Sequence, residues 1–393
     1  GWSYGFGLAG IFMFLGMLQF LMAKNLFGNI GERPSVVAAS EKLRKENETV
    51  EIKAEKLNPF TPLDKILITL SALCGLLYLF NDPVSKVSGS GFLNFSIGGY
   101  DGSTVTVLSG LVMFLYLLVS RVNRYERVIR DRIIAVAIFG LFTVFFFAAF
   151  EQSLGSMTIF ARDYTARNLT GASAMIFKII DSILTVGPLA IITWVLFLLF
   201  KKTYSKIPYS NIILGIAFLG LWLIVSWKIN REFSKDTTEA PASWFGILNS
   251  FFIITLAPFF SKWWESKYNP SAAMKYGLGL ILLGLGFAIL AFGTSNIPPG
   301  AKTASVSMIF LILAYLLHTM GELCLSPVGL SYLSKLVPSR MIGFMFGIWY
   351  LAIAIGQKTA GTMGGLIDKI SEEYSLSSFF LIFTIIPIAV GAV

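Results

Sequence analysis

Residues 133–150 read IIAVAIFGLFTVFFFAAF, and no charged side chain interrupts them. An α-helix needs about 20 apolar residues to cross the ~30 Å hydrocarbon core of a bilayer. The run continues past Glu151 and Gln152 to residue 160, so it is long enough. Its apolar residues are continuous and do not alternate with a period of two, which favours a helix over a strand of a membrane barrel. The stretch therefore predicts a transmembrane α-helix.

Further apolar runs of the same kind predict an all-α integral membrane protein. They cover residues 4–23, 66–80, 104–120, 182–200, 211–227, 244–264, 274–293, 305–325, 342–360 and 375–393. The run 66–80 is short and must borrow flanking residues such as Leu63 or Asn81 to span. Because the chain begins at Gly1 rather than at a methionine, and both of its ends lie in apolar runs, we expect it to be a piece of a longer protein.

The composition excludes several classes of protein. The 393 residues are 55% hydrophobic and 13% charged, and the charged share is about half of that in soluble domains. A soluble enzyme, a nucleic-acid-binding domain or a disordered chain would not carry so much apolar surface. The chain has two cysteines, Cys74 and Cys324, both inside apolar runs, and a single histidine, His318. We therefore expect no disulfide framework, no metal site and no cofactor, with His318 as a hydrogen-bonding core residue.

The basic residues of the connections predict how the spans are oriented. If the spans alternate strictly, one side of the membrane receives about two thirds of the 31 lysines and arginines, and that side is expected to be cytoplasmic. The loop with Lys201 and Lys206 then faces the cytoplasm, as does the C-terminus. Four arginines recur every three residues and form either an anchor for anionic headgroups or a specific lipid site. They are Arg121, Arg124, Arg127 and Arg130.

A few charged residues lie inside the apolar runs, where they are costly and usually face a cavity or a partner. Glu151 and Glu322 have no basic residue near them in sequence. Each is either a proton- or substrate-binding group or half of an interhelical pair. Burial favours the neutral acid and a nearby cation favours the charged form, so such a group can carry a proton when access alternates. Lys178 and Asp181 are three apart and are expected to neutralise each other on one helix face.

Small and helix-breaking residues also lie inside the runs. Pro258 and Pro327 each remove a backbone hydrogen bond and introduce either a fixed kink or a gating bend. Gly343 and Gly347 are four residues apart and predict a close contact between helices.

One stretch carries a resemblance to a known family. Residues 321–331 read GELCLSPVGLS, and KLVP at 335–338 and FGIWY at 346–350 follow. These residues resemble the tenth helix, short loop and eleventh helix of the proton-dependent oligopeptide transporter (POT/PTR) family, as found in bacteria. GWSYGFGLAG at 1–10 resembles the start of the sixth helix, Phe150-Glu151-Gln152 the seventh, and residues 244–258 with Asn249 the eighth.

The resemblance implies the major facilitator fold, with two six-helix bundles that rock around a central cavity. Residues 1–23 would be the sixth transmembrane helix, 24–132 a cytoplasmic linker with an extra helix pair, and 133–393 the C-terminal bundle. The chain departs from the family in two places. Ser250 follows Asn249 where many members have proline, and a two-span segment is inserted at about 164–240.

By the same resemblance, the protein is a proton-coupled importer of di- and tripeptides in the inner (plasma) membrane. Its partners would be peptides, protons and the lipid bilayer, without nucleic acid. Glu322 and Asn249 would bind the peptide amino end, and Glu151 would couple transport to protons. Three further residues would line side-chain pockets, although one of them, Trp349, is alternatively a core aromatic. They are Ser326, Trp349 and Phe150.

Other functions remain open at this point. A carrier of the same family could transport nitrate or an amino-acid conjugate, and the first-helix motif, which lies outside this sequence, would discriminate. A membrane-embedded enzyme would need a nucleophile and base cluster or metal ligands, against which a single His318 argues. A passive scaffold would not need unpaired acids such as Glu151 and Glu322.

Overall fold

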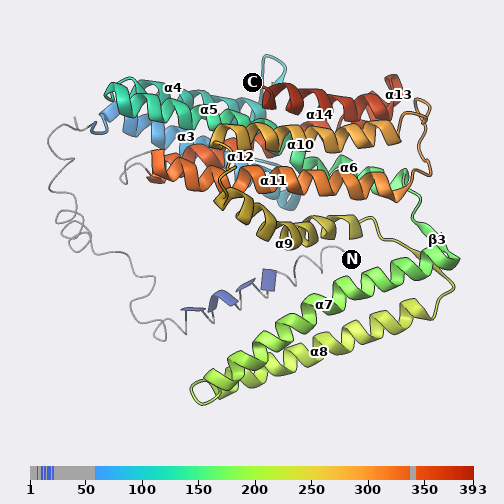
Figure 1. The fold of residues 1–393 in the computed structure, drawn as a ribbon. Helices are drawn as coiled ribbons and strands as arrows, with labels where there is room; N and C mark the ends of the chain where they lie inside the picture. The colour runs from blue at the N-terminus through green and yellow to red at the C-terminus, as the bar shows by residue number, and fades with distance from the viewer. Residues whose placement is uncertain are drawn as a thin grey trace. The chain divides into compact units, whose positions relative to one another are not determined.

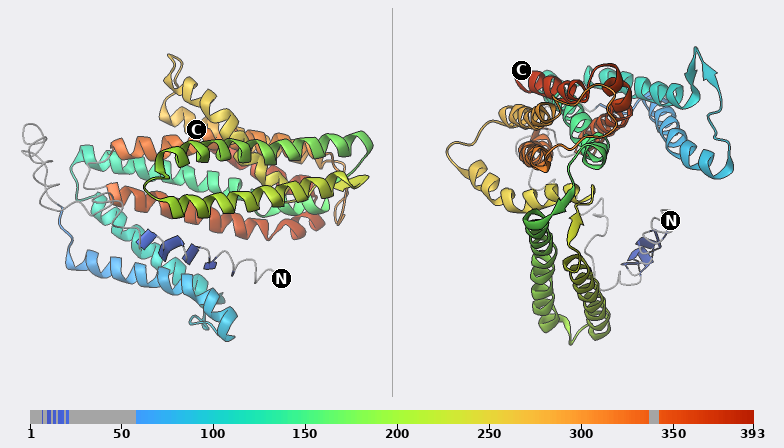
Figure 2. Two further views of the ribbon diagram at one scale, coloured as in Figure 1. Left: turned by 90° about the horizontal axis from the view of Figure 1, so that it is seen from below. Right: turned by 90° about the vertical axis from the view of Figure 1, so that its right-hand side faces the viewer.

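The computed structural model describes residues 58–336 and 342–393, together with isolated helical positions between residues 7 and 21. The chain divides into two compact units, Gly1–Glu126 and Arg127–Val393. Most of the described residues lie in helices, which confirms the all-α prediction (Figures 1 and 2). The predicted span 4–23 and the polar linker 24–57 lie largely or wholly outside the described residues.

The first unit contains a helical hairpin whose two helices pack against each other. Helix α3 (Pro62–Ser88) and helix α4 (Gly102–Val122) are joined through the short strands β1 (Ser96–Ile97) and β2 (Tyr100–Asp101). Thr61 and Asp64 form a reciprocal capping box at the start of α3. The predicted run 66–80 thus borrows residues at both ends. At the start of α4, hydrogen bonds from Thr104 hold the pKa of Asp101 below its usual range.

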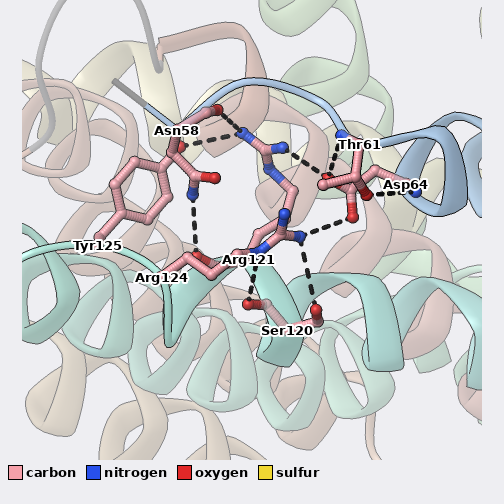
Figure 3. A network of polar contacts seen from close by, with 7 residues as sticks. All are labelled: Asn58, Thr61, Asp64, Ser120, Arg121, Arg124 and Tyr125. Atoms are coloured by element: carbon pink, nitrogen blue, oxygen red, sulfur yellow. Dashed lines mark hydrogen bonds and ion pairs between the residues drawn. The ribbon is translucent and has the colours of Figure 1, made fainter. Parts of the chain in front are cut away.

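An ionic network joins the two helices of this hairpin (Figure 3). Asp64 is buried and accepts from Arg124 at 2.6 Å and from Arg121 at 3.2 Å. Arg121 also donates to the carbonyl of Asn58. Arg121 and Arg124, half of the predicted basic stripe, are therefore bound to Asp64 of the protein itself. The other half, Arg127 and Arg130, lies against Asp131 at 3.9 and 3.7 Å.

The second unit is a bundle with an inserted hairpin. Its elements are α5 (Arg127–Phe150), η2 (Glu151–Ser153), α6 (Ser156–Asp163), β3 (Asn168–Thr170), α7 (Gly171–Thr203), α8 (Pro208–Phe233), β4 (Thr237–Glu239), α9 (Trp244–Glu265), α10 (Ala272–Gly293), α11 (Met308–Leu336), α12 (Ile342–Gly364), α13 (Ile367–Glu373) and α14 (Leu376–Gly391). Helix α10 packs on α11 and α14, α5 packs on α12, and α9 packs on α11 (Figure 1).

Close helix contacts in the bundle depend on glycines of α10. A Cβ added at Gly321 of α11 would lie 2.6 Å from the carbonyl oxygen of Gly279, so only glycine allows the two backbones to approach this closely. By contrast, a Cβ at Gly343 or Gly347 would meet no described atom within 4 Å. Among the described residues, these two glycines therefore form no close helix contact.

Helices α7 and α8 form the inserted hairpin, and strands β3 and β4 pair antiparallel at its base (Figures 1 and 2). The most apolar stretches of both helices are unburied in the protein, as expected for lipid-facing surfaces. Lys178 and Asp181 of α7 do not pair with each other, which corrects the sequence-based expectation. Asp181 pairs with Lys228 of α8 at 2.9 Å, and Lys178 donates to the carbonyl of Lys235.

Within the described ranges, eight helices are long and apolar enough to cross a membrane, and the bent pair α13–α14, with an angle of 115°, adds a ninth. The predicted run 133–160 lies in one candidate span, Arg127–Asp163, in which the 3-10 turn η2 separates the end of α5 at Phe150 from the start of α6 at Ser156. This turn contains Glu151, and it places this residue where the backbone leaves the regular helix.

Candidate functional site

The turn after α5 fixes the first part of the site. Gln152, which is buried, donates to the carbonyl of Ala360 in α12 at 2.9 Å and accepts from Ser156 at 2.7 Å. These bonds satisfy an amide that would be costly to bury without partners. They tie the irregular turn to α12 and hold its orientation. A short 3-10 stretch within a longer helix often marks a functional hinge.

Glu151 lies at the start of this turn and is half-buried. Its carboxylate accepts a hydrogen bond from the side-chain amide of Gln357 in α12 at 3.1 Å. The described residues form no ion pair with Glu151. The preceding Phe150 stacks on Phe146 with ring centroids 5.4 Å apart. The acid therefore combines an apolar neighbourhood with one neutral hydrogen-bond donor.

Helix α11 presents the second acid. Glu322 is half-buried and accepts from the side-chain amide of Asn249 in α9 at 2.9 Å. The same amide donates to the hydroxyl of Thr319 at 3.1 Å, and that hydroxyl donates to the carbonyl of Tyr315. Asn249 therefore uses both of its N–H groups to orient the polar face of α11. Two predicted site residues, Asn249 and Glu322, are in direct contact.

A cavity of about 200 Å³ lies where these elements meet. Its walls come from α5, the turn after it, α9 and α11. Its lining residues are Phe150, Glu151, Ser153, Leu154, Gly246, Asn249, Tyr315 and His318. Three of the predicted site residues, Phe150, Glu151 and Asn249, thus line one hollow, and Glu322 is bonded to one of them.

The other two predicted site residues lie elsewhere on the bundle. Ser326 is half-buried one turn beyond Glu322 on α11. Trp349 of α12 is buried and lies edge-on to Tyr276 of α10, with ring centroids 6.4 Å apart. Its ring also occupies the space beside Gly329, where a Cβ would lie 2.2 Å from it. Trp349 packs in the core between helices and does not line the cavity beside Glu151.

His318 is buried, as expected of a core residue, but its ring makes no hydrogen bond within the part of the chain that the structure describes. The ring lies over Phe287 at 4.5 Å between centroids, and it fills the space beside Gly286. Gly286 and Phe287 of α10 lie against one side of the ring, and the ring also lines the cavity beside Glu151. No group of three or more metal-ligating side chains occurs among the described residues.

Comparison with known proteins identifies the bundle. The family model described as "POT family" matches residues 218–380, which include Asn249 and Glu322. This part of the chain is therefore similar to the POT family. A peptide transporter of Yersinia enterocolitica is 24% identical over 369 residues, which cover 93% of this chain and 55% of the relative. A di-/tripeptide transporter of Lactococcus lactis is 32% identical over 200 residues, 45% of this chain and 39% of the relative.

A solved POT family structure shares the fold of this chain. A POT family transporter in complex with a thioalcohol-conjugated peptide matches with a TM-score of 0.59 at 21% identity, over 99% of this chain and 61% of that one. The likeness confirms the predicted helical-bundle fold. The match covers only 55% of the length of the Yersinia relative. The rest of that relative has no counterpart in this chain.

Sequence reasoning missed three contact residues of this site. Tyr315 and Thr319 precede Glu322 by seven and three positions, so Tyr315, Thr319, Glu322 and Ser326 share one helical face. That polar stripe in an apolar span was a signal available in the sequence. Gln357 lies in an apolar run as well, but its pairing with Glu151, 206 positions away, depends on how α5 and α12 pack.

Proposed function

We propose that the full-length protein is a proton-coupled symporter that imports di- and tripeptides across the inner membrane by alternating access, and that it is not an enzyme. The names of its relatives, among them a peptide transporter and a di-/tripeptide transporter, support the substrate class. The observation that carries the proposal is a pair of half-buried acids held by neutral amides. Glu151 lines the cavity, and Glu322 is bonded to Asn249, which lines it.

Glu322 and Asn249 bind the peptide amino end in this proposal. A free peptide carries an ammonium group, and a carboxylate held by a neutral amide still has lone pairs to accept from it. Asn249 donates to only one oxygen of Glu322, Oε2. Charge-assisted hydrogen bonds are stronger than neutral ones, so this contact would anchor the substrate's end.

Glu151 is the proton-linked acid in this proposal. Phenylalanines precede it, and its hydrogen-bond partner is the neutral side-chain amide of Gln357. A cation from the part of the protein outside this chain would favour the charged form when the two halves approach. Alternation between these surroundings would load a proton on one side of the membrane and release it on the other.

The remaining assignments follow the same scheme. In this proposal, Phe150, Ser326 and Trp349 contact the side chains of the peptide. Trp349 would do so in a conformation that exposes it to the central cavity. Residues 1–23 form the sixth transmembrane helix, 24–132 the linker with its helix pair, and 133–393 the C-terminal bundle with an insertion at about 164–240.

The proposal is tested by uptake into proteoliposomes that contain the full-length protein. With a pH gradient, acid outside, as the sole energy source, labelled dipeptide should accumulate, and an ionophore that dissipates the gradient should abolish accumulation. Glu151→Gln fixes the neutral state, so accumulation should vanish. Exchange of peptide for peptide needs no net proton movement and should persist.

A matched control is Glu373→Gln, which removes an exposed carboxylate outside the cavity. It should accumulate peptide like the wild type. If Glu151→Gln still concentrates peptide with a pH gradient alone, Glu151 is not the coupling acid. If the wild type neither accumulates nor exchanges peptide, the proposed function is wrong.

A further inference from the structure

A second cavity lies between the inserted hairpin and the bundle, and the proposed transport does not use it. Its volume is about 450 Å³, within the range of small-molecule sites. Residues of α7, α8, β4 and α9 line it. Its polar and charged lining residues are Lys178, Asp181, Ser182, Lys228, Arg231, Glu232, Lys235, Thr238, Glu239 and Ser243.

The carboxylates of this cavity each have a basic partner. Asp181 pairs with Lys228 at 2.9 Å, and Trp244 also donates to it at 3.1 Å. Glu232 pairs with Lys235 at 2.9 Å. Glu239 pairs at 2.6 Å with Arg167, which lies outside the lining. The acids of the wall are therefore already neutralised.

Lys178 is the exception among the cations of this wall. It is only 6% exposed, and the structure gives its ammonium one partner, the carbonyl of Lys235. None of the described carboxylates lies within ion-pair distance of it. An ammonium has three N–H donors, so two of them remain for a ligand in the cavity. A buried cation without an anion is costly, and a bound anion would remove that cost.

The position of Lys178 along α7 matches the level of lipid headgroups. Helix α7 has 33 residues and is therefore about 50 Å long, roughly 20 Å more than the hydrocarbon core. Lys178 is seven residues from Gly171, the start of α7, or about 10 Å along the axis. A centred helix places it at the boundary between hydrocarbon and headgroups. Trp244 lines this cavity and Trp227 precedes Lys228 of its wall, and tryptophans are enriched at membrane interfaces.

We propose that this cavity binds a phosphate-bearing anion through Lys178, with Ser182 and Arg231 as further donors. The phosphate could belong to a phospholipid headgroup or to a water-soluble phosphate ester. The apolar part of the wall, Phe177, Ile229 and Ile247, faces the same cavity and would contact the glycerol and upper acyl chains of a lipid.

The test is native mass spectrometry of the full-length protein with three probes. Phosphatidylglycerol carries phosphate and acyl chains, diacylglycerol carries the chains alone, and glycerol phosphate carries the phosphate alone. Lys178→Gln should weaken phosphatidylglycerol binding about tenfold, the value of a charge-assisted hydrogen bond. Diacylglycerol should bind weakly and equally to the wild type and this variant.

Two further variants keep the result interpretable. Lys202→Gln removes the same charge from the exposed opposite end of α7 and should leave binding unchanged. Ser182→Asp keeps Lys178 but adds a negative charge to the wall, so it should also weaken binding. It therefore tests the proposal even if Lys178→Gln fails to fold.

If glycerol phosphate binds as tightly as phosphatidylglycerol and depends equally on Lys178, the site holds and its ligand is a soluble phosphate. If Lys178→Gln and Ser182→Asp bind phosphatidylglycerol like the wild type, or if Lys202→Gln loses as much, the proposal is overturned.

Discussion

At the scale of single residues, the hydrogen bond between Asn249 and Glu322 sets how a substrate would meet the second acid. It links α9 to α11 and leaves part of the carboxylate available in a half-buried place. Glu322→Gln retains the size and an acceptor for Asn249 but removes the charge. We expect affinity for peptides with a free amino terminus to fall about ten- to a hundredfold, because a charge-assisted contact is lost.

Binding competition on the full-length protein measures this effect. Peptides with an acetylated amino terminus lack the ammonium group and should lose far less affinity, and Glu373→Gln should leave both kinds unchanged. Equal losses for free and blocked peptides would remove Glu322 from contact with the amino end.

The sequence identified Glu151, Asn249 and Glu322 because polar groups in apolar spans are costly and therefore conspicuous. It failed where a contact depends on a neighbouring helix. Lys178 and Asp181 share a helix face, yet Lys228 of α8 takes the carboxylate. His318 likewise lacks the hydrogen bond expected from its polarity, and Gly286 and Phe287 of α10 lie against one side of its ring.

At the scale of elements, the crossing of α10 and α11 depends on the absence of side chains. Gly321→Ala would put a methyl group 2.6 Å from the carbonyl oxygen of Gly279, and backbone cannot move aside as a flexible side chain can. Overpacking of this kind costs about 1–3 kcal/mol, so the free energy of unfolding in detergent should fall by that amount. Gly343→Ala is the matched control, because its Cβ would meet no described atom within 4 Å. A similar loss in both variants would contradict the close crossing.

The α3–α4 hairpin depends on a buried ion pair. Asp64→Asn leaves the guanidinium of Arg121, 7% exposed, without its carboxylate. Removing one partner of a buried pair costs about 3–5 kcal/mol. Thermal unfolding of the full-length protein, detected as protease cleavage between α3 and α4, should show this loss of stability. Asp131→Asn, at 58% side-chain exposure, should cost less than about 1 kcal/mol. Equal costs would mean that the network in Figure 3 contributes no more than a surface pair.

Helix positions were largely predictable, since the bilayer demands long apolar runs, and the observed α4, α9 and α10 match their predicted runs within two residues. The interruption after Phe150 was not predictable. The interruption contains Gly155, whose backbone is non-helical just before α6, but a single glycine does not locate the end of a helix. The bond from Gln152 to Ala360 of α12, 208 positions away, holds the turn and depends on how α5 and α12 pack.

At the scale of the whole molecule, two added crossings leave the orientation of every later span unchanged. The basic tip of the α7–α8 hairpin should therefore lie in the cytoplasm, on the same side as the α9–α10 loop.

The test is cysteine labelling of a full-length variant whose Cys74 and Cys324 have been replaced. A single cysteine at Lys201 or Lys206 should resist a membrane-impermeant thiol reagent added to intact cells. A cysteine at Asn296, which is exposed in the loop between α10 and α11, should react from outside and serves as the positive control. Permeabilised cells should label all three positions. Labelling of Lys201→Cys in intact cells at the rate of Asn296→Cys would mean that the hairpin does not cross the membrane twice, and the headgroup level assigned to Lys178 would then fail with it.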